Sequence, residues 1–145
     1  MKKIILIIAL ALLLSACSTD EDAIKAQKII KYHKEKYDSL PLSGKLVDGI
    51  REIEVKAYQF RWDPDTIVVK KGEKIRFIVE SMDLPHGFEI EGISIPGWNQ
   101  DKSINKGEKA VIELAAAEAG TWDIVCTAYC GPGHGDMKGK YIVRE

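Results

Sequence analysis

The most informative stretch of the chain is Cys126-Thr-Ala-Tyr-Cys130-Gly-Pro-Gly-His134-Gly-Asp-Met137, because it places two thiols, an imidazole and a thioether within twelve residues. Thiolate, thioether and imidazole are donors that bind copper. Cys126 and Cys130 are four positions apart, so both sulfurs can face inward on a curled loop whose glycines permit unusual backbone angles. A further imidazole is available upstream at His86. The sequence therefore predicts a metal site built from two separate segments.

The loop resembles that of the binuclear copper (CuA) domain of cytochrome c oxidase subunit II, which reads Cys-x-x-x-Cys-Gly-x-x-His-x-x-Met. The segment from Ser81 to Phe88 is similar to the one that supplies the first histidine of that family. Gln59-Phe-Arg-Trp62 is similar to its preceding aromatic segment, and Gly120-Thr-Trp122 to the strand that enters its copper loop. The resemblance covers residues 41–145 and is strongest to the ba3-type branch.

The resemblance implies two copper ions bridged by both cysteine sulfurs, with one histidine on each copper. The implied ligands are His86, Cys126, the main-chain carbonyl of Ala128, Cys130, His134 and Met137. The family often has glutamate where this chain has Ala128, so the carbonyl is kept and any side-chain role is lost. If an electron enters through an exposed aromatic ring, Trp62 is the first choice, although a structural role for it is the alternative. Asp83 is expected either to orient His86 or to cap a turn.

Three other sites fit the same residues. A mononuclear blue-copper site needs one cysteine, two histidines and a weak methionine, which would leave Cys126 unused. A tetrahedral zinc site would use the two cysteines and the two histidines. A disulfide between Cys126 and Cys130 is the expected state of the copper-free protein in air.

The resemblance implies an electron-transfer domain that performs no catalysis by itself. The donor would be a cytochrome c or a small copper protein, and the acceptor the catalytic subunit of a haem-copper terminal oxidase. A free-standing, lipid-anchored electron carrier and a copper delivery protein are the alternatives. The sequence contains no nucleophile–base pairing and no glycine loop for phosphate. A net charge of −1 argues against a nucleic-acid partner, whose binding surface would be basic.

The N-terminus has the features of an export signal. Lys2 and Lys3 precede an apolar run that is shorter than the ~20 residues of a membrane-spanning helix. Leu14-Ser-Ala-Cys17 resembles the lipobox of bacterial lipoproteins, in which the cysteine carries the lipid. We therefore expect a signal peptide over residues 1–16, lipidation at Cys17, and a domain in the bacterial cell envelope that faces the periplasm or the cell exterior.

The remaining pattern predicts a tether and a β domain. Residues 17–45 are expected to form a tether with a short helix from about 22 to 37, which ends before Pro41. From residue 46 to residue 145, short runs of alternating apolar and polar residues are separated by glycine-containing turns. This pattern indicates an antiparallel β-sandwich or barrel. The resemblance adds that the fold is a cupredoxin-like Greek key.

Overall fold

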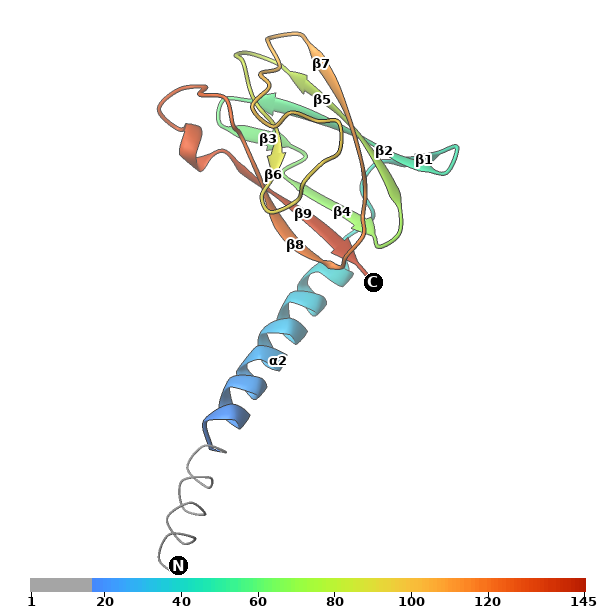
Figure 1. Ribbon diagram of the computed structural model, residues 1–145, viewed down its shortest axis with the longest axis vertical. Helices are drawn as coiled ribbons and strands as arrows, with labels where there is room; N and C mark the ends of the chain where they lie inside the picture. Colours follow the sequence, from blue (N-terminus) through green and yellow to red (C-terminus); the bar gives the residue numbers. More distant parts are fainter. Residues whose placement is uncertain (1–16) are drawn as a thin grey trace, which may run out of the picture. The chain divides into compact units, whose positions relative to one another are not determined.

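The computed structural model describes residues 17–145, which fall into two compact units, one ending at Ser39 and one running from Leu40 to Glu145. In the second unit, two β-sheets enclose a common core (Figure 1). The predicted signal peptide, residues 1–16, lies outside the described residues, and so does the side chain of Cys17. The boundaries of the signal and the tether therefore stay predictions.

The first unit is described as one helix, α2 (Cys17–Asp38), which contains the helix predicted from about residue 22 to 37. Its described side chains are exposed, apart from the half-buried Tyr37. Pro41 follows the end of the helix, as expected for a residue that cannot continue it. Within residues 17–145, no helix is long and apolar enough to cross a membrane.

The first sheet has the strand order β1-β2-β5-β7, and β3 also pairs with β2. Its strands are β1 (Lys45–Val47), β2 (Ile50–Tyr58), β3 (Arg61–Asp63), β5 (Lys74–Ser81) and β7 (Lys109–Ala115). The second sheet has the order β4-β9-β8-β6. Its strands are β4 (Thr66–Lys70), β6 (Glu89–Ile90), β8 (Gly120–Val125) and β9 (Lys138–Arg144), and a 3-10 helix, η1 (His134–Asp136), precedes β9.

The predicted β-sandwich is confirmed, with one difference in strand direction. β2 pairs with β5 and β4 pairs with β9 in parallel, whereas the other strand pairs are antiparallel. Successive side chains alternate between the two faces of a strand in either case. The alternation therefore predicts that a segment is a strand, but not the direction in which it pairs.

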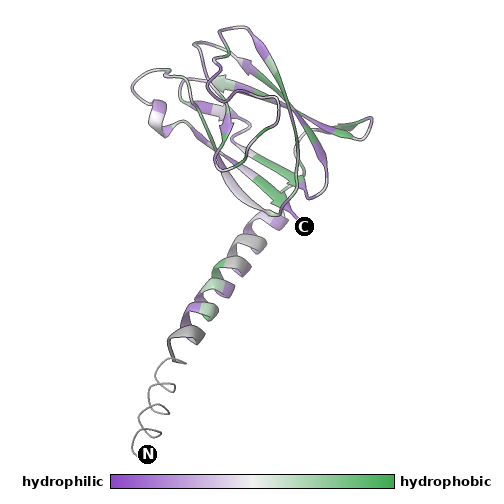
Figure 2. Ribbon diagram, viewed as in Figure 1, coloured by the Kyte–Doolittle hydropathy of each residue, from purple (hydrophilic) through white to green (hydrophobic). Residues whose placement is uncertain are grey.

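The core lies between the two sheets and is built from alternate residues of each strand. In β5, Ile75, Phe77 and Val79 are buried while Lys74 is exposed. Figure 2 shows this interleaving of hydrophobic and hydrophilic residues along the strands. Aromatic rings fill the centre, where Phe77 contacts Phe88 at 5.4 Å and Tyr141 at 5.9 Å between ring centroids. Burial of such apolar surface is the main force that stabilises the sandwich.

The strand pairing brings three connections to the same end of this unit. β2 and β5 run in parallel, so their last residues, Tyr58 and Ser81, point the following chain in the same direction. In the second sheet, Val125 at the end of β8 pairs with both Glu89 and Lys138. The hairpin between β2 and β3, the segment 82–88 and the loop 126–137 therefore meet.

A partly buried ion pair joins the start of β2 to the turn before β5. Arg51 is 8% exposed, and its guanidinium donates to both carboxylate oxygens of Glu73, at 2.6 and 2.7 Å. It also donates to the carbonyl of Ser43 at 3.0 Å, while the Lys70 N–H donates to Glu73 at 2.9 Å. The hydrogen bond from Arg51, opposed by burial, lowers the pKa of Glu73 below its ordinary value of 4.5.

We expect Glu73→Gln to lower the free energy of unfolding by about 2 kcal/mol at pH 7, because the bidentate charged bond is lost. A carboxyl whose pKa is lowered by folding stabilises the fold above its unfolded pKa and stops doing so as pH falls through the folded value. The difference between variant and parent should therefore shrink below pH 4.5, as measured by urea unfolding at pH 7 and pH 3. Glu145→Gln, which breaks an exposed pair with Lys71, should change little at either pH. A Glu73 effect that is independent of pH would contradict this role.

Candidate metal centre

The two ends of the sulfur-rich loop are fixed by strand pairing. Cys126 directly follows β8 and Met137 directly precedes β9, and the neighbouring residues Val125 and Lys138 are paired. Between them the chain turns back on itself through η1, where the His134 N–H donates to the Gly131 carbonyl at 3.0 Å. The sheet therefore sets where the two sulfur-bearing residues at the loop ends can lie.

His86 is held by its backbone as well as by its side chain. It forms an isolated antiparallel bridge with Ile104, with N···O distances of 3.1 and 2.8 Å. Its side chain is fully buried. A buried imidazole needs partners for its ring nitrogens, and both face polar atoms.

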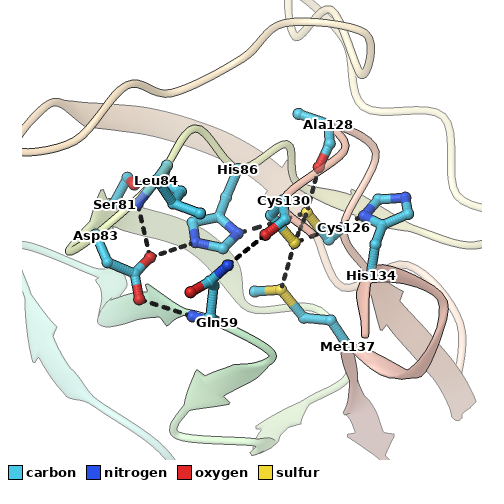
Figure 3. A network of polar contacts seen from close by, with 10 residues as sticks. All are labelled: Gln59, Ser81, Asp83, Leu84, His86, Cys126, Ala128, Cys130, His134 and Met137. Carbon is cyan, nitrogen blue, oxygen red and sulfur yellow. Dashed lines mark hydrogen bonds and ion pairs between the residues drawn. The ribbon is translucent and has the colours of Figure 1, made fainter. Parts of the chain in front are cut away.

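The structure brings the predicted donor atoms into one cluster (Figure 3). The sulfurs of Cys126 and Cys130 are 4.0 Å apart. The Nδ1 atom of His86 lies 3.6 Å from the Cys126 sulfur, and that of His134 lies 3.7 Å from the Cys130 sulfur. The Met137 sulfur is 3.9 Å from the Cys130 sulfur. Each cysteine thus has its own imidazole, and the methionine lies beside one of them.

The main-chain carbonyl of Ala128 also faces this cluster. Its oxygen lies 3.1 Å from the Cys126 sulfur. The sequence predicted this carbonyl as a donor only through resemblance, because a backbone atom leaves no mark in residue types. Its position depends on the course of the loop, so alanine serves as well as a larger residue.

The cluster is buried except at the half-buried His134, and its thiols are free. Cys130 is 2% exposed and Met137 is 1% exposed, and neither cysteine is in a disulfide. Burial, together with the nearby Cys126, raises the pKa of the Cys130 thiol to about 11. Metal ligation requires the thiolate, so a metal that binds here must displace this proton. The donor set of sulfur and imidazole fits a soft or borderline metal ion.

Asp83 orients the buried histidine. One carboxylate oxygen faces His86 Nε2 at 2.8 Å and accepts from the Leu84 N–H at 2.7 Å, while the other accepts from the Gln59 N–H at 2.8 Å. Burial acts to raise the pKa of Asp83, but these hydrogen bonds outweigh it and hold the pKa below its ordinary value. The carboxylate therefore favours a proton on Nε2 and leaves Nδ1 bare toward the sulfur. Both roles expected for Asp83, orienting His86 and capping the turn, are present.

Trp62 does not offer the exposed ring that the electron-uptake hypothesis requires. It is 2% exposed and packs edge-on against Phe88, with ring centroids 5.6 Å apart. β3 turns its side chain into the core, where an alternating strand places every second residue. An exposed aromatic residue near the donor cluster is Tyr129, which is 75% exposed. Its ring centroid lies 5.8 Å from that of His134.

Two residues at the tip of the β2–β3 hairpin contact the loop, and their roles were missed from the sequence. The Gln59 side-chain amide donates to the Cys130 carbonyl at 2.7 Å. The Phe60 ring lies so close to Gly133 that a methyl group there would be 2.5 Å from its Cδ2 atom. The segment stood out as similar to a family motif, but no spacing signal links it to residues some seventy positions away.

Among known protein families, the cupredoxin-like domain family matches residues 4–143 of the chain. Over 93 residues the chain is 33% identical to cytochrome c oxidase subunit 2 of Thermus thermophilus, which covers 64% of this chain and 65% of that relative. Over 70 residues it is 34% identical to quinol oxidase subunit 2 of Sulfolobus acidocaldarius, covering 46% of this chain and 39% of the relative. The chain thus spans less than two thirds of either relative.

Among solved structures, the fold is similar to a chain in the cryo-EM structure of a heme-copper terminal oxidase dimer. The TM-score is 0.57 with 26% sequence identity, and the match covers 99% of both chains.

We expect Gly133→Ala to destabilise the fold by about 1–3 kcal/mol, because the added methyl group overlaps the Phe60 ring. Gly135→Ala is the matched control, since a methyl group there meets nothing within 4 Å. Thermal unfolding of the reduced protein would measure both. Equal effects of the two substitutions would show that the Phe60 contact is not tight.

We also expect His86 in the reduced, metal-free protein to carry its proton on Nε2 at pH 7, because Asp83 accepts there. Nitrogen-15 NMR of the imidazole ring would show this tautomer directly. Asp83→Leu should let the Nδ1-protonated tautomer become populated, while the His134 signals stay unchanged. A predominant Nδ1 proton in the parent protein would refute this arrangement.

Proposed function

Because the chain belongs to the cupredoxin-like domain family and is homologous to cytochrome c oxidase subunit 2 of Thermus thermophilus, we propose that it is a binuclear copper (CuA) electron-transfer domain. The proposed ligands are His86, Cys126, the Ala128 carbonyl, Cys130, His134 and Met137. The observation that carries the proposal is the pair of buried free sulfurs 4.0 Å apart, each facing a different imidazole nitrogen.

This symmetry favours two metal ions over one. In a mononuclear blue-copper site a single cysteine is used, yet here Cys126 is as well supplied with a nitrogen neighbour as Cys130. A structural zinc site would need neither Met137 nor the Ala128 carbonyl, both of which point at the sulfurs. Two copper ions held by these residues would supply one-electron exchange.

The residues of the chain do three things for such a centre. The two cysteines give up their protons, and the high pKa of Cys130 makes copper uptake easier as pH rises. Asp83 holds His86 with Nδ1 toward the metal. The sandwich buries His86, both cysteines and Met137, and donors held in a packed core would move little when the oxidation state changes.

We propose that electrons reach the centre through the exposed surface beside His134. Tyr129 is 75% exposed and its ring lies against that imidazole. An exposed aromatic side chain beside the proposed centre suits short-lived docking of a redox partner. The donor would be a cytochrome c or a small copper protein, and the acceptor a haem-copper oxidase catalytic subunit.

The proposed location is the bacterial cell envelope, with the domain anchored to a membrane by lipid on Cys17. The lipobox-like sequence Leu14-Ser-Ala-Cys17 supports this. Export would place the site in an oxidising compartment, where the thiols must be kept reduced until copper binds.

Anaerobic loading of the reduced protein with one equivalent each of Cu(I) and Cu(II) tests the proposal. We expect two copper ions per chain and an electron paramagnetic resonance signal from one unpaired electron shared by both. Cys126→Ser and Cys130→Ser should each abolish the shared signal, because one of the two proposed thiolate ligands is lost. Uptake of a single ion, or preference for zinc, would refute the binuclear centre. Co-purification with a haem-containing subunit would separate an oxidase component from a free-standing carrier or a copper delivery protein.

A further inference from the structure

Gln59, at the tip of the β2–β3 hairpin, contacts both segments that carry the proposed ligands. Its backbone N–H donates to Asp83 at 2.8 Å, and its side-chain amide donates to the Cys130 carbonyl at 2.7 Å (Figure 3). One residue therefore bridges the segment 82–88 and the loop 126–137 with two independent hydrogen bonds.

The first bond bears on His86. The Gln59 N–H occupies one oxygen of Asp83, and the other oxygen is left for His86 Nε2 and the Leu84 N–H. A carboxylate held at both oxygens has little freedom to rotate. The direction of the His86 ring is thus tied to the position of the hairpin.

The second bond bears on the cysteine loop. Gly131 follows Cys130 with a φ of +127°, a conformation that side chains rarely adopt, and a methyl group there would lie 2.9 Å from the Gln59 amide nitrogen. The neighbouring Phe60 packs on Gly133. The loop backbone therefore approaches the hairpin closely at two glycines that follow the Cys130 carbonyl, to which Gln59 donates.

From these contacts we propose that Gln59 is a positioning residue. It fixes the segment 82–88 and the loop 126–137 relative to each other in the metal-free protein. This inference rests on the proposed copper function of the site. Preorganised ligands lose less freedom when they bind, so a metal is held more tightly.

The test compares Gln59→Leu with Gln100→Leu in the full-length protein. Both substitutions remove a glutamine amide that donates to a main-chain carbonyl, to that of Cys130 in one case and to that of Ile93, at 3.1 Å, in the other. In the reduced, metal-free protein, we expect Gln59→Leu to speed amide hydrogen exchange in residues 126–137 several-fold. Gln100→Leu keeps the main-chain carbonyl that accepts from the Thr127 hydroxyl, so it should leave exchange there unchanged.

Copper affinity, measured by competition with a chelator, should fall about three- to tenfold in Gln59→Leu, the range expected for one net hydrogen bond. It should be unaffected in Gln100→Leu. If the two variants behave alike in both measurements, the inference is overturned. If the parent protein takes up no copper, the proposed function fails, while the exchange measurement still decides the role of Gln59.

Gln59→Glu covers the case in which the leucine variant does not fold. Glutamate keeps the shape of the side chain but presents oxygens to the Cys130 carbonyl and adds a charge near Asp83. A positioning role by donation predicts at least as large a loss of affinity as in Gln59→Leu. A role in filling space alone predicts parent-like affinity, and that result would also overturn the inference.

Discussion

The separation of two buried thiol sulfurs is the constraint on which the rest of this structure depends. At 4.0 Å, Cys126 and Cys130 are close enough to share metal ions and yet remain free thiols. Burying two thiolates is costly unless cations or hydrogen-bond donors lie nearby. The thioether of Met137 carries no charge, so the proposed copper ions would supply the positive charge that two thiolates need.

The fold keeps this separation by fixing the loop at several points. Strand pairing fixes the two ends of the loop, and Phe60 at the hairpin tip packs on its middle at Gly133. Outside the loop, the bridge to Ile104 fixes the backbone of His86. None of these contacts alone is strong. Their combination explains why a glycine-rich loop, whose backbone has many allowed conformations in isolation, can hold its donor atoms in one arrangement.

Local sequence patterns predicted the donor residues of the loop and the strands of the sandwich. The donors of the loop lie within twelve residues, and the alternation in β5 follows directly from burial of one face. Long-range relations were not predictable in the same way. The parallel pairing of β2 with β5, the inward turn of Trp62 and the reach of Gln59 to Cys130 depend on how distant segments meet, which residue spacing does not encode. The fold brings together the donor atoms that were chosen by resemblance, and that they bind copper stays a prediction.

The bridge between His86 and Ile104 also bears on how the chain can evolve. It divides the long connection between β6 and β7 into two parts with different freedom. Residues 91–103 are fixed by buried Ile95 and by the hydrogen bond from Trp98 Nε1 to the Phe88 carbonyl, so insertions that spare these contacts can accumulate there without shifting the histidine. Residues 105–108 are a tight turn tied to Ser81 at the end of β5, and a length change there would act directly on the backbone of His86. Diversification of this face among descendants should therefore be confined to the first part of the connection.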